Sequence, residues 1–357
     1  MTKVYIEPYH IPELPFSLVF WPSLKFPLKE SRVFLREIMA QYQEPFFAVV
    51  TTPKEADFFA VPFEFFFVLD GYPEYLERVY ASAQAHHKKV LLFDYSDYVD
   101  RVPTLPPHAV LFRVSVYRHH QQPGEIVMPY FVEDLGARYA ITPREKTKEP
   151  KIGYCGQADF ATLGRHFRAV VKRSLAFLSL IARFDTTPSV HTRGIFWRQR
   201  VLRVLKGSGL PLEIIARRFY SLHRKSGSFD PERIRTDYVE NLRTSDLALC
   251  VRGDANASQR FYETLSASRI PLFIDTDCVL PLEEVISYHR IVLRISWDEL
   301  ATLPACVRLW YDSISPESFL TIEREGRVVY DEYLRLDRFF ALVFDRERSP
   351  YKQILFS

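Results

Sequence analysis

Short apolar runs alternate with segments of helical periodicity along the first half of the chain. Apolar residues at helical spacing predict helices at 31–43 and 73–89. The predicted strands are the apolar runs at 46–50, 58–63, 89–95, 109–116 and 125–131. Strands separated by helices are typical of a largely parallel sheet with crossover helices, so this half is predicted to be an α/β domain.

The same alternation restarts after a polar break. The stretch ITPREKTKEP at 141–150 is charged, flanked by proline and without apolar periodicity, so it predicts a linker and a domain boundary near residue 145. A strand and turn at 151–157 and a long basic helix at 164–184 follow. Further strands are predicted within 246–253, 269–275 and 290–296. The second half is therefore predicted to be another α/β domain.

The end of the chain has a different pattern. In 316–344, aromatic and aliphatic residues recur at helical spacing with many charges between them, which predicts a helical segment that packs back across the domains. The expected organisation is a first domain at 1–145, a second at 146–320, and a C-terminal helical segment at 321–357 that returns towards the first domain.

Composition limits the class of protein. A chain of 357 residues is long enough for two cores. Hydrophobic residues make up 47% and charged residues 25%, which is ordinary for a soluble globular protein and argues against general disorder or a membrane bundle. The formal net charge of +3 is too small to indicate a nucleic-acid partner.

The cysteines and the N-terminus bear on location. Cys155, Cys250, Cys278 and Cys306 form neither a CxxC nor a CxxH pattern, so neither a zinc site nor a disulfide framework is predicted. The N-terminus lacks the apolar core of a secretory signal, and no run of about 18 apolar residues occurs. We expect a cytoplasmic protein.

A loop, a helix and a strand follow one another in RGDANASQRFYETLSASRIPLFIDTD, at 252–277. The preceding strand ends at Val251, and Asn256 or Ser258 is the expected cap of a helix that runs to about Ser268. Beyond the carboxyl end of a parallel strand, a helix N-terminus offers free N–H groups and the positive end of the helix dipole. This arrangement suits a phosphate group.

Three charged side chains of this segment fit a nucleotide. Glu263 projects from the second turn of the helix, where its carboxylate could accept hydrogen bonds from both hydroxyls of a ribose. Arg252 and Arg260 could neutralise a diphosphate. On this pattern alone, an ordinary strand, loop and helix with surface ion pairs is the alternative.

The strand that follows ends in two acids, Asp275 and Asp277, as in sugar transferases that hold a divalent metal through an Asp-x-Asp motif. Such a motif normally lies well before the end of its fold, whereas these acids come late and directly after the nucleotide helix. The metal site is therefore kept as an alternative.

The block CVRGDANASQRFYETLSASRIPLFIDTDCVLPLEEVI at 250–286 resembles the signature of the exostosin-like glycosyltransferases. In that signature a Ser-x-Arg-x-x-Glu helix leads into an Ile-Pro strand, an Asp and a Val-Leu-Pro-Phe-like turn. The matching residues are Ser258, Arg260, Glu263, Ile270, Pro271, Asp277 and Val279 to Leu282.

The resemblance extends to both predicted domains. The stretch at 51–67 resembles the Pro-x-x-Ala-Asp-x-Phe-x-Val-Pro-Phe element of the family, KIGYCGQ at 151–157 its Phe-x-Gly strand and turn, and 290–307 its later strand and Asp-led helix. Thr264 and Arg269 stand where the family usually has Ala and Gly, so we expect relaxed packing of the helix on the sheet and a different pocket for the donor base.

The resemblance implies a GT-B fold, with two Rossmann-like domains facing a cleft. The nucleotide-sugar donor would bind the second domain and the acceptor the first, with inversion at the anomeric carbon and without a metal or other cofactor. Many eukaryotic relatives carry an N-terminal membrane anchor and stem, which this chain lacks, so we expect a microbial cytosolic enzyme. The expected donor-binding residues are Gly156, Gln157, Arg252, Ser258, Arg260, Glu263 and Asp277.

Inversion by direct displacement requires a base that accepts the proton of the attacking hydroxyl. It should come from the first domain, at the end of a strand. Glu64, which follows the strand at 58–63, is the first candidate, and Asp97 is the second. A helix cap or a solvated turn is the alternative role for either carboxylate.

The basic stretch at 193–225 could contact the donor diphosphate or an anionic membrane that carries a lipid-linked acceptor. The sequence thus predicts a transferase of polysaccharide biosynthesis that moves a sugar from a nucleoside diphosphate, UDP by preference, onto a glycan hydroxyl. We expect it to be cytoplasmic, and peripheral binding to the cytosolic face of a membrane is the alternative location. The alternatives are the metal-dependent transferase and a non-catalytic protein of the same fold that binds nucleotide or carbohydrate.

Overall fold

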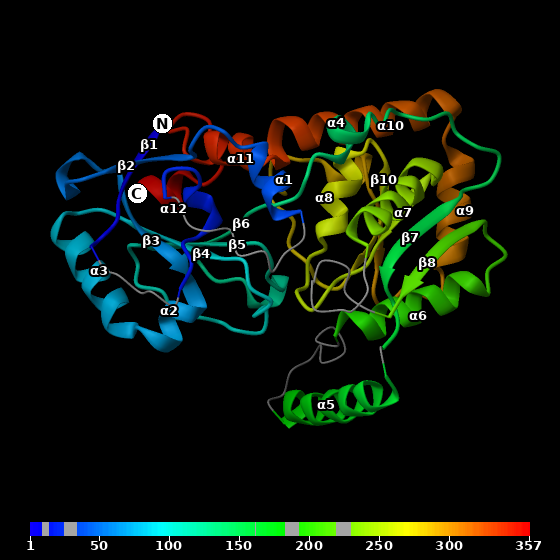
Figure 1. Ribbon diagram of the computed structural model, residues 1–357, viewed down its shortest axis with the longest axis horizontal. Coiled ribbons are helices and arrows are strands. Elements are labelled where there is room, and N and C mark those ends of the chain that lie inside the picture. The colour runs from blue at the N-terminus through cyan, green and yellow to red at the C-terminus, as the bar shows by residue number, and fades with distance from the viewer. Residues whose placement is uncertain (9–13, 25–33, 161, 183–192, 219–229) are drawn as a thin grey trace.

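Two α/β domains lie side by side in the computed structural model of the chain (Figure 1). The structure describes residues 1–8, 14–24, 34–160, 162–182, 193–218 and 230–357. Each domain is built on one parallel sheet, and the sheets have six and five strands. The expectation of two α/β domains that face each other is therefore confirmed.

The N-terminal sheet has the strand order β2-β1-β3-β4-β5-β6. Its strands are β1 (Thr2–Tyr5), β2 (Phe47–Val50), β3 (Phe58–Glu64), β4 (Val90–Asp94), β5 (Ala109–Arg113) and β6 (Glu125–Val127). The helices of this part are α1 (Leu35–Ala40), α2 (Phe65–Gly71), α3 (Pro73–Ala85) and α4 (Leu135–Tyr139). Because β3, β4 and β5 are buried along their whole length, they appear in the sequence as continuous apolar runs.

The strand predicted at 109–116 ends earlier, at Arg113. The backbone beyond it leaves the sheet and contacts the other domain. Arg118 N donates to the carbonyl of Asp277 at 2.9 Å, and Tyr117 forms an isolated antiparallel bridge with Cys278. Val114 and Val116 are buried in this segment and not in the sheet. Their apolar side chains thus belong to the contact between the domains.

The C-terminal sheet has the strand order β11-β10-β9-β7-β8. Its strands are β7 (Ile152–Gln157), β8 (Leu212–Arg217), β9 (Leu247–Cys250), β10 (Ile270–Asp275) and β11 (Leu293–Ser296). The helices are α5 (Leu163–Ala182), α6 (Gly194–Lys206), α7 (Pro231–Thr244), α8 (Gln259–Ser266) and α9 (Leu303–Ser313). The chain passes from β7 to β8 on one side and then to β9 on the other, so β7 and β9 flank a topological switch point.

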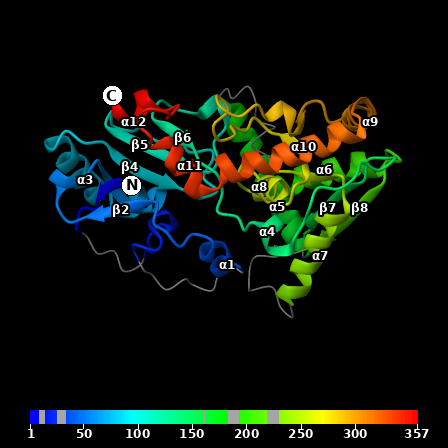
Figure 2. The ribbon, with the colours of Figure 1, turned by 90° about the horizontal axis from the view of Figure 1, so that it is seen from above.

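The C-terminal helices join the domains, as expected. They are α10 (Pro316–Val329), a π-helical turn (Tyr330–Leu334), α11 (Leu336–Val343) and α12 (Lys352–Phe356). From above, α10 runs along the second domain and α11 reaches the first (Figure 2). The ring of Phe340 in α11 lies 5.3 Å from that of Phe47 and 5.8 Å from that of Phe112, between ring centroids. One hydrophobic core thus contains residues of both sheets and of the terminal helices.

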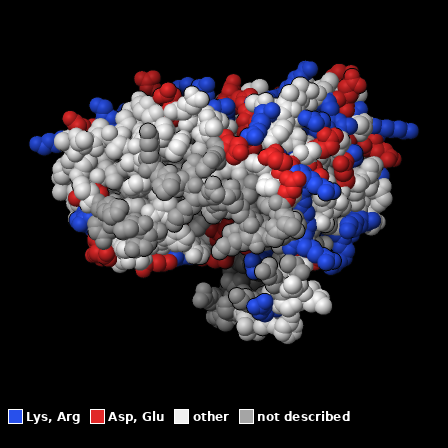
Figure 3. Space-filling view, in the orientation of Figure 1, with Lys and Arg blue, Asp and Glu red and all other residues white. Residues whose placement is uncertain are grey.

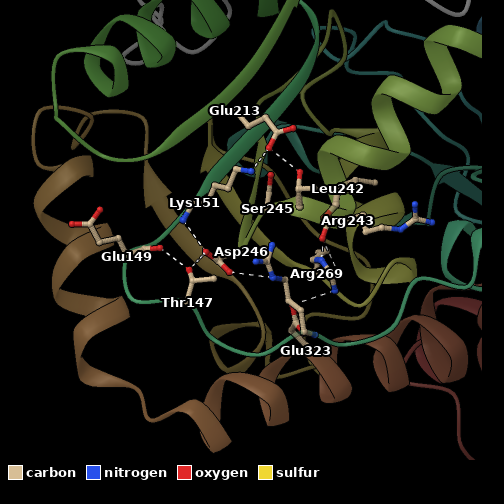
Figure 4. Close-up of polar contacts among 12 residues, drawn as sticks. Thr147, Glu149, Lys151, Glu213, Leu242, Arg243, Ser245, Asp246, Arg269 and Glu323 are labelled. Carbon is tan, nitrogen blue, oxygen red and sulfur yellow. Dashed lines mark hydrogen bonds and ion pairs between the residues drawn. The ribbon is translucent and has the colours of Figure 1, made fainter.

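Buried polar groups hold the linker at 141–150 against the second domain (Figure 4). Asp246 accepts hydrogen bonds from Thr147 Oγ1 at 2.6 Å and from Lys151 N at 2.8 Å. Glu323 accepts from Arg144 N at 2.7 Å. The linker is therefore fixed in place, although its sequence has the composition of an exposed loop.

Arg269, which stands at the position of the family's usual glycine, is part of the same network. Its guanidinium donates to the carbonyls of Leu242 and Thr142, each at 3.0 Å, and pairs with Glu323 at 3.4 Å. Thr264 is fully buried and packs against Cys250, with 3.6 Å between Oγ1 and Sγ. The expectation that these two residues relax the packing is therefore wrong, because both are buried and bonded.

Among the described residues, no helix combines the length and the apolar sequence that crossing a bilayer requires.

We expect Phe340→Ala to lower the free energy of unfolding by about 3–5 kcal/mol, because it removes a buried ring from the junction between the domains. Chemical denaturation monitored by circular dichroism measures the change. The control is Val328→Ala in α10, whose side chain is 49% exposed and which should cost far less. Equal effects of the two variants would show that α11 is not an integral part of the core.

We expect Arg269→Met to lower the free energy of unfolding by about 3–5 kcal/mol at pH 8, because it leaves the carboxylate of Glu323 buried without Arg269 as its partner. Burial already raises the pKa of Glu323 to about 7, and loss of Arg269 would raise it further. Because the pKa of Glu323 is higher in the folded variant than in the unfolded chain, protonation of Glu323 favours the folded state. The loss of unfolding free energy in the variant should therefore shrink as the pH falls towards 5.

The matched control is the exposed pair of Arg290 and Glu325, in which Arg290→Met should change stability by less than about 1 kcal/mol at either pH. A deficit of Arg269→Met that stays constant from pH 5 to pH 8 would contradict the role given to Glu323.

Candidate functional site

A cleft of about 970 Å³ lies between the two domains. The second domain lines it with the carboxyl ends of β7 and β8, the loop after β9 and the first turns of α8. The first domain contributes Tyr95 and Asp97 after β4, and Tyr130 and Phe131 after β6. The cleft is therefore open at the switch point between β7 and β9, where open parallel sheets bind their ligands.

Gly156 allows α8 to approach the end of β7 closely. A Cβ atom at this position would lie 2.5 Å from Nη2 of Arg260, and that nitrogen donates to the carbonyl of Cys155 at 2.6 Å. The guanidinium also stacks on the ring of Tyr154, 4.6 Å from its centroid. Arg260 is thus positioned at the wall of the cleft by β7, and a side chain at 156 would displace its guanidinium.

Glu263 follows on the same side of α8 and also lines the cleft. Tyr238 of α7 donates to its Oε2 at 2.6 Å, which orients the carboxylate. Ser258 is the N-cap residue of α8 by backbone position, but its side chain makes no capping hydrogen bond and lines the cleft. Together with Gly156 and Gln157, these residues form a continuous wall, so most of the predicted donor site is brought together.

Basic side chains dominate the charge of the cleft. Its acidic residues are Asp97, Asp254 and Glu263. Its arginines, twice as many, are Arg168, Arg193, Arg198, Arg217, Arg235 and Arg260. A concave surface with an excess of positive charge attracts anionic ligands.

Several of these arginines are held in place by the protein. Arg198 donates to the carbonyls of Arg252 and Gln157, each at 3.1 Å. Arg217 pairs with Asp237 at 3.0 Å, and Arg193 pairs with Asp254 at 2.8 Å. The cations are therefore oriented before a ligand arrives, which lowers the cost of reorganisation on binding.

Two of the predicted donor-binding residues lie elsewhere. Arg252 is buried, and its Nη1 donates to the hydroxyl of Tyr117 in the first domain at 2.6 Å. Asp277 pairs with His119, also of the first domain. Both side chains thus join the domains and do not line the cleft, because the segment after β5 covers them.

Asp275, the other acid of the Asp-x-Asp alternative, also lies outside the cleft. It pairs with Arg294 at 2.7 Å and accepts from Cys278 N at 2.8 Å. The two carboxylates therefore have different partners and neither faces the cleft. Among the described residues, no group of three or more His, Cys, Asp or Glu side chains has the arrangement of a metal site.

The two candidates for the base differ in location. Glu64 is 6% exposed, caps α2 by accepting from Phe67 N at 3.1 Å, and does not line the cleft. Burial, together with the neighbouring Asp94, raises the pKa of Glu64. The role of helix cap, which was the alternative for this residue, is the one that the structure shows.

Asp97 lines the cleft from the first domain and remains accessible from it. Partial desolvation by the cleft walls, and then repulsion from Asp254, raise the pKa of Asp97. Ala255 N donates to the same carboxylate and opposes the shift. A carboxylate with a raised pKa is a better proton acceptor than an ordinary one, and its place opposite α8 suits a base.

Sequence reasoning missed several side chains of the cleft. Tyr238 orients Glu263 from α7, and Tyr95 and Tyr130 line the cleft from the first domain, yet none belongs to a recognisable motif. The basic stretch at 193–225 did carry a signal. Its residues Arg193, Arg198 and Arg217 line the cleft, whereas 219–229 lie outside the described residues.

Part of the chain matches known proteins. Residues 215–308 match the model of the Exostosin GT47 domain, and this segment contains β9, α8 and β10. An Exostosin-1 homolog of Caenorhabditis elegans is 28% identical over 117 residues, which are 31% of this chain and 30% of that protein. Exostosin-1c of Danio rerio is 29% identical over 99 residues, which are 28% of this chain and 13% of that protein.

The match to the Exostosin GT47 domain falls on the part of the chain that carries the resemblance described above. The chain spans less than a third of the length of these two relatives.

Two solved structures also align with most of the chain. HepE of Anabaena in complex with UDP covers 95% of this chain and 98% of its own, with a TM-score of 0.39 and 8% identity. A glycosyltransferase of Rickettsia africae covers 94% of this chain and 84% of its own, with a TM-score of 0.38 and 11% identity.

We expect Gly156→Ala to weaken nucleotide binding at least about tenfold, because the added methyl group would displace the guanidinium of Arg260. Isothermal titration with UDP measures the affinity. The control is Gly71→Ala in α2, where an added Cβ meets no atom within 4 Å and UDP affinity should not change. Unchanged UDP affinity in Gly156→Ala would exclude Arg260 from the nucleotide site.

Proposed function

We propose that the chain transfers a sugar from a nucleoside diphosphate donor, by expectation UDP, to the hydroxyl of a glycan. The reaction would invert the anomeric carbon and use no metal. The observation that supports this proposal is the arrangement of the cleft, in which the arginine-lined wall around α8 faces Asp97 of the other domain.

The donor would bind the wall formed by the second domain. The N-terminus of α8 and the guanidinium groups of Arg260, Arg217 and Arg198 provide positive charge for a diphosphate. Glu263, oriented by Tyr238, would accept hydrogen bonds from the ribose hydroxyls. This assignment retains Ser258, Arg260, Glu263, Gly156 and Gln157 from the sequence-based prediction and leaves out Arg252 and Asp277.

The chemical step would take place where the two walls meet. The acceptor hydroxyl attacks the anomeric carbon from the side of the first domain, and Asp97 accepts the proton of that hydroxyl. The bond between the anomeric carbon and the diphosphate oxygen breaks at the same time, and the bonding electrons leave with the diphosphate. The arginines stabilise this leaving group, so fixed positive charges can serve where other transferases use a cation.

The acceptor would lie against Tyr95, Tyr130 and Phe131, because these residues line the side of the cleft that carries Asp97. Aromatic rings present flat apolar faces that suit the C–H faces of sugar rings, and a tyrosine adds a hydroxyl for hydrogen bonding. A glycan, free or attached to a lipid, is the acceptor class that fits.

We expect Asp97→Asn to lower kcat by about 10²–10⁴, because the amide cannot accept the proton, with little change in UDP affinity. Transfer from a panel of UDP-sugars is measured by UDP release in the presence of glycan acceptors. The comparison variant is Glu64→Gln, which should keep most of the activity because Glu64 lies outside the cleft. A loss of activity in Glu64→Gln that matches Asp97→Asn would overturn the choice of base.

The acidic limb of the pH profile provides a second measurement. Catalysis needs the ionised Asp97, so kcat/KM should rise as the pH rises through the pKa of this residue. Because that pKa is raised, the limb should lie above the ordinary value for aspartate, near 4. UDP binding without turnover on any donor and acceptor would instead support the non-catalytic alternative.

A further inference from the structure

Helix α5 projects from the body of the second domain, below α6 and β8 in the view of Figure 1. Of its described side chains, only Ala169 is buried, and the others are exposed to solvent. The helix is attached at its beginning, where the ring of Phe160 stacks on that of His166 at 4.9 Å and lies 5.6 Å from that of Phe196 in α6. The described side chains of α5 form no packed apolar face, which a surface helix of a globular domain normally has.

The exposed residues of α5 include an apolar stripe that only Ser174 interrupts among the described side chains. Phe167 is 71% exposed and Leu175 is 61% exposed. The stripe recurs at intervals of three and four residues and occupies an arc of about 140° at 3.6 residues per turn. Its members are Leu163, Phe167, Val170, Val171, Leu175 and Leu178.

The opposite side of α5 faces the protein. The buried Ala169 lies opposite the apolar stripe and lines the cleft, as does Arg168 at the border of the stripe, whereas the stripe itself is exposed to solvent. A helix on the surface of a globular domain normally has the reverse orientation, with its apolar side on the core. The stripe is therefore free to contact an apolar surface outside the protein, next to the opening of the cleft.

The charges around the stripe indicate what that surface is. The sequence of α5, LGRHFRAVVKRSLAFLSLIA, has four lysines and arginines and no acid. The adjoining segment 193–218, which includes α6, has seven basic residues against the single acid Glu213. Figure 3 shows blue side chains on the body at the base of the projecting helix and blue on the helix itself. A basic helix with one broad apolar side is typical of segments that lie in the interface of an anionic membrane.

We propose that α5 binds the surface of an anionic lipid bilayer and inserts its apolar stripe between the headgroups, while Arg200, Arg203 and Lys206 of α6, which do not line the cleft, lie near the lipid phosphates. The alternative occupant, a second copy of the chain, would bring two basic helices together without any acid on either of them, and like charges would repel. Binding in this orientation places the opening of the cleft at the membrane surface, where a lipid-linked acceptor would be found. The proposal stands independently of the sugar transfer, because it concerns binding alone.

Flotation of the full chain with vesicles tests the proposal without any transferase assay. We expect the chain to float with vesicles of phosphatidylcholine that contain phosphatidylglycerol and to stay unbound with vesicles of pure phosphatidylcholine. Added salt should weaken binding, because it screens the attraction to the anionic lipid. Equal binding to both kinds of vesicle at every salt concentration would overturn the assignment of an anionic surface.

Substitutions in the stripe identify the helix. The double variant Phe167→Glu and Leu175→Glu should reduce vesicle binding at least about tenfold, because it places two charges on the inserted side. The matched control is Leu309→Glu in α9, which alters a leucine that is 73% exposed and should bind vesicles like the original chain. Both variants should keep the original melting midpoint and the rise of that midpoint on addition of UDP, since all three residues are exposed.

Two outcomes would overturn the proposal. The first is vesicle binding by the double variant that equals that of Leu309→Glu. The second is a dimer, detected by sedimentation, that the double variant dissociates while vesicle binding is absent from the original chain. That second result would assign the stripe to contact between copies.

Discussion

The contact between the segment after β5 and the loops after β9 and β10 is the constraint on which the rest of the structure depends. It joins the domains through backbone groups, with Arg118 bonded to Asp277, and through the buried pair of Arg252 and Tyr117. On the same edge, the aromatic rings of α11 fill the core of the first sheet. With one edge closed in this way, the two rows of strand ends can meet only across a cleft of limited width.

This geometry explains the division of labour between the two walls. The second domain supplies an excess of positive charge, and much of that charge is oriented by carbonyl groups and carboxylates of the protein itself. The first domain supplies a carboxylate whose pKa is raised by partial desolvation and by Asp254. In the proposed reaction, one wall would hold the diphosphate and the other would accept the proton, so transfer would need both.

The network around Asp246, Glu323 and Arg269 shows how a departure from a family pattern is accommodated. An arginine in place of glycine needs space and partners, and here the carbonyls of Leu242 and Thr142 and the carboxylate of Glu323 provide them. The same network fixes the linker, so the residue that differs from the pattern also helps to set the relation between the domains. The effect of such a substitution cannot be judged from the local motif, because some of the partners of the new side chain, here Thr142, lie more than a hundred residues away in the sequence.

The sequence by itself determined the two α/β domains, the returning C-terminal helices and the local order of β9, α8 and β10, because these follow from apolar periodicity and from short-range motifs. For the same reason it grouped Ser258, Arg260 and Glu263, which lie within one turn and a half of one helix and line the cleft together. Only the tertiary structure decided which charged residues face the cleft. Arg252 and Asp277 turn towards the first domain, Glu64 caps a helix while Asp97 lines the cleft, and α5 exposes its apolar side. These outcomes depend on contacts between segments far apart in the chain, and periodicity carries no information about such contacts.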